Sequence, residues 1–477
     1  MSFPTTHPQR WAFTPRQWRI LKLHLLFTII LGLCLLPYLG HAVSKLGTPS
    51  TPANVTQLAE LENVSVRAAG RGDPSTKPTN GHEVLTSYAG PENLQAALEQ
   101  DRAEPLSLAA ADFDEDGVPD LVTGYSHDGR GIVSLRRGNV DSIYPHSPEA
   151  KQSEIAGNFT TGPFLSTAHV FQVPIAPDFI GTGDFDADGH WDVVVAARGK
   201  EFLSLLRGNG RGNFGVPNDI RLPGAVTALI TGEINRADGL ADVVVAVDGE
   251  GGAKALVYEG PAGALKAAPE SFQLPAPANS LALGQLSSAY TIDLAVAAGS
   301  ELLVVYGRDR KLTLPLEEQE SVRPARVERR SFTGAVKSLV IGRFDESPWS
   351  EIAALVAGGE VQLLSRGVAK RRGRDKEPLF AEWMKRELPS PRPGAERLIV
   401  ANVSTSAPDD LLVLDSSDGQ VRVLRAGRES KSSLGTLLGM KDSQHESLSL
   451  TVGLAETVAV LPMQLDTDAL TDLVMLR

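Results

Sequence analysis

The sequence has 477 residues, of which 42% are hydrophobic, and a formal net charge of −12. A chain of this length and apolar content can bury a large core. The acidic balance excludes nucleic acid as an expected partner, because phosphate binding requires a surplus of Lys and Arg. The single cysteine, Cys34, cannot form an intramolecular disulfide, so another device must stabilise the fold.

Residues 1–42 are predicted to be a signal peptide or a membrane anchor. They contain four basic residues and no acidic one, and Leu23 to Leu36 is almost wholly apolar. Gly40-His41-Ala42 is typical of a cleavage site. The apolar run is short for a membrane span, which needs about 20 residues, and this favours cleavage. We therefore expect an extracellular, periplasmic or cell-surface protein, with membrane contact only through this segment if it is uncleaved.

Residues 43–103 are predicted to be a flexible stalk that contains strands able to complete a blade of the following domain. Residues 43–80 are rich in Thr, Pro, Gly and Ser, a composition typical of flexible segments. Asn63 to Arg67 and His82 to Tyr88 could form strands, and Pro91 to Asp101 could form a short helix.

Two stretches of nine residues share one acidic pattern, with aspartates at positions 1, 3, 5 and 9 and glycine at position 6. Alternating acidic side chains in a short loop can direct their oxygens to one centre, and glycine permits the sharp turn. The carboxylates repel one another unless a cation lies among them, and oxygen ligands favour calcium over zinc or copper. The alternative is an acidic turn that is simply solvated, but the repetition of the same nine-residue pattern favours calcium binding. The predicted side-chain ligands are Asp112, Asp114, Asp116 and Asp120 in the first loop and Asp184, Asp186, Asp188 and Asp192 in the second.

These loops do not fit an EF-hand, which requires a glutamate at position 12 and flanking helices. Position 12 is Thr123 in the first loop and Val195 in the second. The residues after each loop are apolar and β-branched, which indicates buried strands.

The pattern of loop, acidic residue and apolar strand recurs along the chain. The second unit is the clearest. It has a predicted strand at Phe202 to Leu206 and a glycine-rich turn at Gly208 to Gly215, which together indicate about four strands per unit. Units of about 50 to 60 residues suit the blade of a propeller. We therefore predict an all-β, seven-bladed β-propeller of four-stranded blades over residues 104–477. The seven acidic markers are Asp120, Asp192, Asp242, Asp293, Glu351, Asp410 and Asp472.

The two acidic loops and the turn from Asn209 to Phe214 resemble the FG-GAP, or VCBS-type, repeats of bacterial surface proteins and of the integrin α-subunit propeller. The resemblance is most specific in the first two repeats. It implies that each loop joins the first two strands of a blade and holds Ca²⁺ on one face of the disc. It also implies that the backbone carbonyls of Val118 and His190, at position 7, are further ligands, and that partners bind the other face.

The later loops are weaker candidates for calcium. The third, Glu233 to Asp242, keeps oxygen ligands but has one extra residue, and the seventh, Gln464 to Asp472, lacks the glycine. The fourth and sixth have too few carboxylates. The seventh unit also stops after its second strand, so either the N-terminal strands complete it or the chain is a fragment.

No catalytic constellation is found, because the histidines are scattered and match neither a Ser-His-Asp nor a zinc-site spacing. The insertion from Asp141 to Asp178 suits protein or carbohydrate contact, or it packs over the disc. Its aromatic residues and histidines are Tyr144, His146, Phe159, Phe164, His169 and Phe171. We expect a non-enzymatic calcium-binding propeller that acts as an adhesion or binding module for an extracellular protein or glycan. The alternatives are a polysaccharide lyase or hydrolase, and a structural spacer within a larger adhesin.

Overall fold

The computed structural model describes residue 84 and residues 86–477, except 288–289, 320, 346–348, 367–381, 389–392, 405–408, 416, 425–447 and 451–456. All of these residues belong to one compact unit, Arg71–Arg477. The predicted signal or anchor segment and the predicted strand Asn63 to Arg67 lie outside the described residues. Among the described residues, no helix has the length and apolarity needed to cross a membrane.

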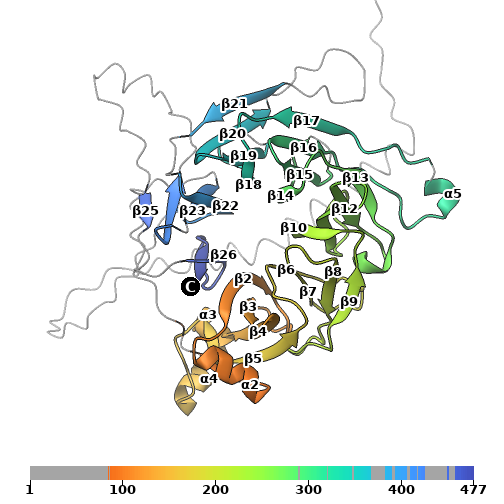
Figure 1. Cartoon of the computed structure of the whole chain (residues 1–477). Helices are drawn as coiled ribbons and strands as arrows, with labels where there is room; N and C mark the ends of the chain where they lie inside the picture. The colour runs from red at the N-terminus through yellow and green to blue at the C-terminus, as the bar shows by residue number, and fades with distance from the viewer. Residues whose placement is uncertain are drawn as a thin grey trace, which may run out of the picture. The chain divides into compact units, whose positions relative to one another are not determined.

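The compact unit is a β-propeller, which confirms the predicted all-β class (Figure 1). The first strands of successive sheets contact one another in chain order, and strand β26 contacts both the sixth sheet and the first. The first sheet has the order β1-β5-β4-β3-β2, with β1 Ser87–Ala89, β2 Glu104–Ala111, β3 Asp120–His127, β4 Arg130–Gly138 and β5 Phe164–Val173.

Five further sheets each have four antiparallel strands in sequence order. They are β6 Phe179–Gly183, β7 Asp192–Ala196, β8 Phe202–Leu206 and β9 Asn218–Arg221; β10 Ala225–Gly232, β11 Asp242–Asp248, β12 Lys254–Tyr258 and β13 Glu270–Gln273; and β14 Ala278–Gly284, β15 Asp293–Ala298, β16 Glu301–Val305 and β17 Val327–Ser331. The remaining two are β18 Val336–Gly342, β19 Glu351–Val356, β20 Glu360–Arg366 and β21 Trp383–Glu387; and β22 Ala395–Ala401, β23 Asp410–Asp415, β24 Gln420–Leu424 and β25 Leu448–Leu450.

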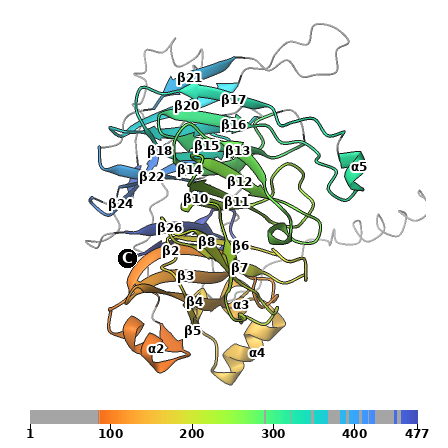
Figure 2. The same cartoon turned by 45° about the vertical axis from the view of Figure 1, so that its right-hand side comes forward.

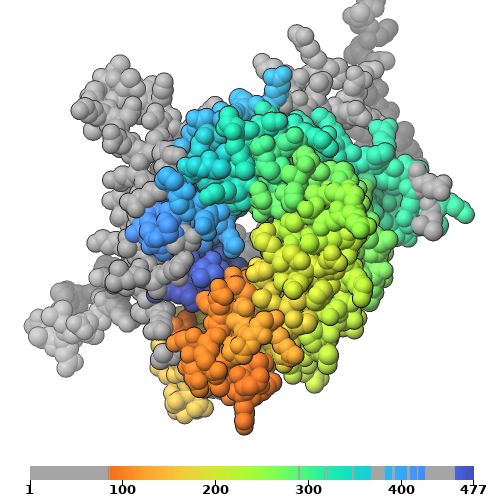
Figure 3. Space-filling model, viewed as in Figure 1, coloured from red at the N-terminus to blue at the C-terminus, as the bar shows by residue number. Residues whose placement is uncertain are grey.

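The prediction of seven four-stranded blades is wrong, because the described residues form six blades. The seventh acidic marker begins a unit of only two strands, β26 Ala459–Met463 and β27 Asp472–Leu476. This small sheet lies beside the first one (Figure 3) and contacts β2. Every residue of β27 is half-buried, whereas β7, the corresponding second strand of the second blade, is buried throughout.

The N-terminal strand completes a different blade from the one considered in the sequence analysis. Strand β1 pairs in parallel with β5, so it is a fifth strand at the outer edge of the first sheet and not part of the seventh unit. A helix, α2 (Glu92–Glu99), follows where one was predicted and packs against β1 and β5 (Figure 2). The other helices of the described residues are α3 Val140–Ile143, α4 Pro148–Ala156, η1 Ala264–Lys266 and α5 Leu316–Gln319.

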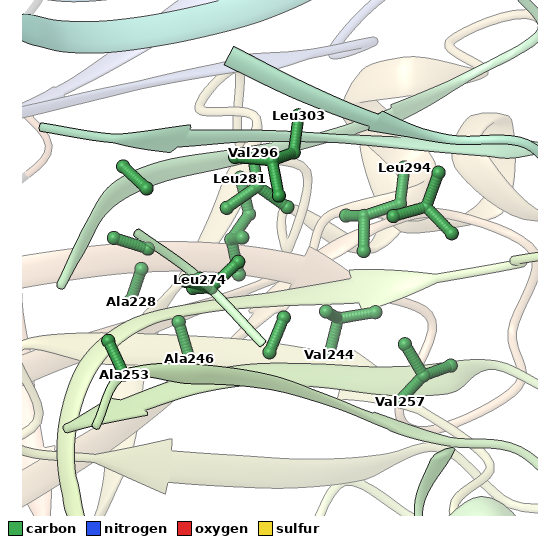
Figure 4. Close-up of a cluster of buried hydrophobic side chains, with 14 of the residues drawn as sticks. Ala228, Val244, Ala246, Ala253, Val257, Leu274, Leu281, Leu294, Val296 and Leu303 are labelled. Atoms are coloured by element: carbon green, nitrogen blue, oxygen red, sulfur yellow. The ribbon is translucent and has the colours of Figure 1, made fainter. Parts of the chain in front are cut away.

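The core lies between neighbouring sheets, where apolar second strands face each other. Val244 of β11, Leu281 of β14 and Leu294 of β15 belong to one buried cluster that joins the third and fourth blades (Figure 4). Burying each such side chain contributes about 1.5–3 kcal/mol. The long apolar runs that marked each repeat are therefore the surfaces that hold adjacent blades together.

The insertion after Asp141 is partly a strand of the first blade and not one long loop. Residues 164–173 form β5, and α3 and α4 precede it. The Phe171 ring lies 5.1 Å from the Phe214 ring of the second blade, so it is a packing residue between blades. Tyr144, after α3, remains 46% exposed.

Candidate metal centres

The two acidic loops occupy equivalent places in the first two blades. The first joins β2 to β3, and the second joins β6 to β7, as the resemblance implied. Gly117 and Gly189, at position 6, have φ angles of 93° and 90°, so each is in a conformation that residues with a Cβ rarely adopt. The glycines therefore provide the predicted sharp turn.

The aspartates at position 1 fold each loop back on itself. Asp112 accepts hydrogen bonds from the N–H groups of Asp116 (3.0 Å) and Gly117 (2.9 Å). Asp184 accepts the corresponding bonds from Asp188 (3.1 Å) and Gly189 (2.9 Å). These bonds bring positions 1, 3 and 5 to one side of the turn.

Each loop brings three aspartates together. Asp112, Asp114 and Asp116 each offer a carboxylate oxygen within 4.8 Å of the others, and so do Asp184, Asp186 and Asp188. Because calcium binds oxygen at about 2.3–2.6 Å, ligands of one ion can be up to about 5 Å apart. The spacing of both groups therefore fits a shared calcium ion.

The middle aspartate of each loop has a buried oxygen that the protein leaves unpaired. The Asp114 side chain is only 3% exposed, and its Oδ2 bonds to Arg137 Nε. Its Oδ1 is buried without a hydrogen-bond partner among the described residues. Asp186 repeats the arrangement: Arg207 Nε lies 2.7 Å from Oδ2, and Oδ1 is buried and unpartnered. A buried carboxylate oxygen without a partner is costly, and a bound cation removes that cost.

The electrostatics of the first loop agree with this fit. The pKa of Asp116 is raised to about 6 by burial and then by the nearby charges of Asp114 and Asp112. Three carboxylates held this closely resist ionisation together unless a positive charge lies among them. A divalent ion supplies that charge.

The aspartates at position 9 lie apart from these groups and are bound by the backbone. Asp120 is fully buried and accepts N–H bonds from Phe113 (2.9 Å) and Gly138 (2.7 Å). Asp192 is also fully buried and accepts N–H bonds from Phe185 (3.0 Å) and Gly208 (2.9 Å). Both residues therefore connect the start of the loop to the end of the third strand, and their role as metal ligands stays a prediction.

We call this arrangement the position-9 clamp: the acidic residue at position 9 accepts the N–H of the residue at position 2. It recurs in four of the later loops, including the fourth and sixth, which have too few carboxylates for calcium. The equivalent pairs are Asp242 with Ile234 (3.0 Å), Asp293 with Leu286 (2.8 Å), Asp410 with Val403 (3.0 Å) and Asp472 with Leu465 (2.9 Å). The acidic marker persists through the repeats because it holds the loop to the blade, with or without a metal.

Two arginines were missed by the sequence analysis. Arg137 is the second-last residue of β4 and Arg207 directly follows β8, and each precedes the glycine that donates to the position-9 aspartate. The Arg-Gly pair at the same place in both repeats was the signal that could have identified them. Each guanidinium satisfies one oxygen of the middle aspartate, which orients the other.

A positively charged side chain of the protein lies beside the third loop. Its position 3 is Asn235, whose amide donates to Glu259 (2.7 Å), and Arg310 of the fourth blade lies 3.0 Å from the same carboxylate. Both members of the ion pair are largely buried. The guanidinium of Arg310 thus neutralises Glu259, the acid that the amide at position 3 contacts, without a metal.

The comparison with protein families places the sequence similarity at the first loop. The FG-GAP repeat matches residues 105–135, which run from β2 through the first acidic loop to β4. The chain is an FG-GAP β-propeller protein. No curated protein matches its sequence.

Solved structures with a similar arrangement include BBS1N in complex with ARL6DN, at 12% identity and a TM-score of 0.46, covering 83% of this chain and 92% of that one. Sqt1 from Chaetomium thermophilum has 12% identity and a TM-score of 0.45, covering 80% and 78%. The Dos1 propeller has 10% identity and a TM-score of 0.41, covering 76% and 73%. At TM-scores below 0.5, these similarities support no statement about function.

Within this FG-GAP propeller, the described residues form two groups of three clustered carboxylates, both in the first two blades. In the third loop, Glu233 takes the place of the first aspartate and accepts the N–H groups of Asp238 and Gly239. In the seventh, Asp466 and Asp468 accept backbone N–H groups instead of meeting a third carboxylate. Calcium binding in those two loops stays a prediction.

Proposed function

We propose that this FG-GAP propeller binds calcium in its first two acidic loops and acts as a secreted or cell-surface binding module. The observation that carries the proposal is the buried, unpartnered oxygen of Asp114, repeated at Asp186. The grouping of three aspartates in each loop supports the same assignment. The protein would thus use metal binding in place of disulfides to stabilise blades outside the cell.

The tryptophan in the second loop provides a selective test. Trp191 lies between His190 and Asp192 and is 41% exposed, so it can sensitise the luminescence of Tb³⁺ bound in that loop. The first loop has Pro119 at the same position and so has no indole of its own. We expect saturable Tb³⁺ luminescence that calcium displaces.

Two variants make the test specific. Asp184→Asn should weaken the luminescence titration at least about tenfold, because it removes a charged ligand. Trp191→Phe should abolish the signal but leave calcium binding by calorimetry unchanged. Absence of both luminescence and calorimetric heat in the folded wild-type chain would reject calcium binding.

We further propose that the partner is an extracellular protein or glycan and that the propeller has no catalytic activity of its own. The clustered carboxylates are accounted for by metal binding and the clamp, so no free acid–base pair remains assigned to hydrolysis. Binding of the calcium-loaded chain to a glycan array tests the partner class. Turnover of acidic polysaccharides by the same preparation would contradict the absence of chemistry. Recovery of the protein in the secreted or surface fraction of its host tests the localisation.

A further inference from the structure

The two acidic loops touch each other across the boundary between the first and second blades. Glu115 Oε1 of the first loop lies 2.6 Å from His190 Nδ1 of the second. Glu115 stands between Asp114 and Asp116, and the N–H of His190 donates to Asp188 (2.9 Å). The contact therefore joins residues that lie inside both groups of candidate ligands.

A glycine turn of the second blade supports this contact. The N–H of Gly212 donates to the Phe113 carbonyl of the first loop (3.0 Å). A Cβ at Gly210 would lie 2.6 Å from His190 Nδ1 and 2.7 Å from Glu115 Oε1, so a larger residue there would displace the pair. The turn thus keeps the two loops in a fixed relation.

We propose that the first two loops bind calcium cooperatively, with Glu115 and His190 as positioning residues that link them; this rests on the proposed function. Glu115 has a φ of 59°, a conformation that residues with a Cβ seldom adopt. An ion in the first loop fixes Asp114 and Asp116 on either side of Glu115. Glu115 then holds His190, and with it the backbone at position 7 of the second loop.

The physical basis of this cooperativity is the conformational entropy that a loop loses when it binds an ion. A second ion binds more tightly when the loop that receives it is already ordered, because less conformational entropy is lost. The coupling is reciprocal, so each loop must change the affinity of the other by the same factor. We expect a factor of at least about fivefold, the low end of typical allosteric coupling.

The experiment follows the second loop while altering the first. Trp191-sensitised Tb³⁺ luminescence of the full chain is titrated at one fixed pH for wild type, Asp112→Asn and Glu115→Ala. Asp112→Asn removes a ligand of the first loop, whereas Glu115→Ala leaves every proposed ligand in place and removes the carboxylate that joins the loops. Alanine suits this position, because Ala187 occupies position 4 of the second loop with a φ of 57°.

We expect both variants to weaken Tb³⁺ binding in the second loop by at least about fivefold, the low end of typical allosteric coupling. Glu154→Ala, on the exposed surface of α4, removes one negative charge far along the chain and should have no effect. Circular dichroism and melting in chelator show that each variant is folded before titration.

The outcomes separate the two proposals. No saturable binding to wild type rejects calcium binding itself. Binding with the same second-loop affinity in wild type and Asp112→Asn overturns the cooperativity. Weaker binding in Asp112→Asn but not in Glu115→Ala overturns the assigned link.

Discussion

Replacing Asp192 with asparagine separates the position-9 clamp from metal binding. The side chain is fully buried, and both of its oxygens accept backbone N–H groups, at 3.0 Å from Phe185 and 2.9 Å from Gly208. Asparagine has nearly the same shape but only one acceptor oxygen. Its NH₂ group must therefore face one of these two donors.

The expected loss of stability comes from the one backbone N–H group that Asp192→Asn leaves without an acceptor. Leaving a buried N–H without an acceptor costs about 1–3 kcal/mol. Asp192→Asn should therefore lower the free energy of unfolding by about 1–3 kcal/mol. Asp192→Ala leaves both donors unpaired and should cost about twice as much.

Denaturant unfolding in chelator and in saturating calcium is the assay. The clamp predicts that the Asp192→Asn loss is already complete in chelator. Asp184→Asn is the matched control, because position 1 belongs to the metal group and its loss should grow when calcium is added. The clamp reasoning is refuted if Asp192→Asn unfolds like wild type in chelator and differs only in calcium.

Three other perturbations test the structure. Gly129→Ala should lower the free energy of unfolding by about 1–2 kcal/mol, because it places a residue with a Cβ at a positive φ. Gly263→Ala should cost more, because a Cβ at Gly263 would also lie 2.4 Å from a backbone carbonyl oxygen of the second loop, whereas one at Gly129 meets nothing within 4 Å. Equal losses in thermal melts would contradict this close approach. Arg310→Met should lower the free energy of unfolding by about 3–5 kcal/mol, because it leaves the buried Glu259 carboxylate without its cation. Adding Glu259→Gln should recover part of that loss in denaturant unfolding. No recovery would count against the ion pair. Burial raises the pKa of Asp293 from 3.8 to about 6, so between these values the folded chain binds more protons than the unfolded chain, and this group's contribution to stability falls as pH rises through that window. Asp293→Asn should flatten the unfolding free energy measured in chelator across that range, and an unchanged pH slope would argue against the shift.

The acidic loops were largely readable from the sequence, because their chemistry is local. The spacing of Asp112, Asp114 and Asp116 around a glycine is enough to predict that their oxygens meet, and the structure brings them within 4.8 Å. The apolar run after each marker likewise predicted a buried strand, since a strand covered on both faces is apolar throughout. The repeat of these local features gave the propeller class.

The sequence was less informative about residues whose partners come from other strands or blades. Nothing near Asp120 in the chain indicates that Gly138 donates to it, or that Arg137 pairs with Asp114. The predicted number of blades was wrong for a related reason. The acidic marker at Asp472 shows that a repeat unit begins there, but not how many strands pair in its sheet.

The sequence by itself determined the repeating unit, the apolar strands and the grouping of aspartates, because each depends on residues a few positions apart. Only the tertiary structure decided that the last aspartates of the first two loops bind a glycine near the end of the third strand, that Arg310 neutralises Glu259 beside the third loop, and that Glu115 meets His190. Those contacts join residues from 16 to 75 positions apart, which only strand pairing within a blade and the ring of blades place side by side.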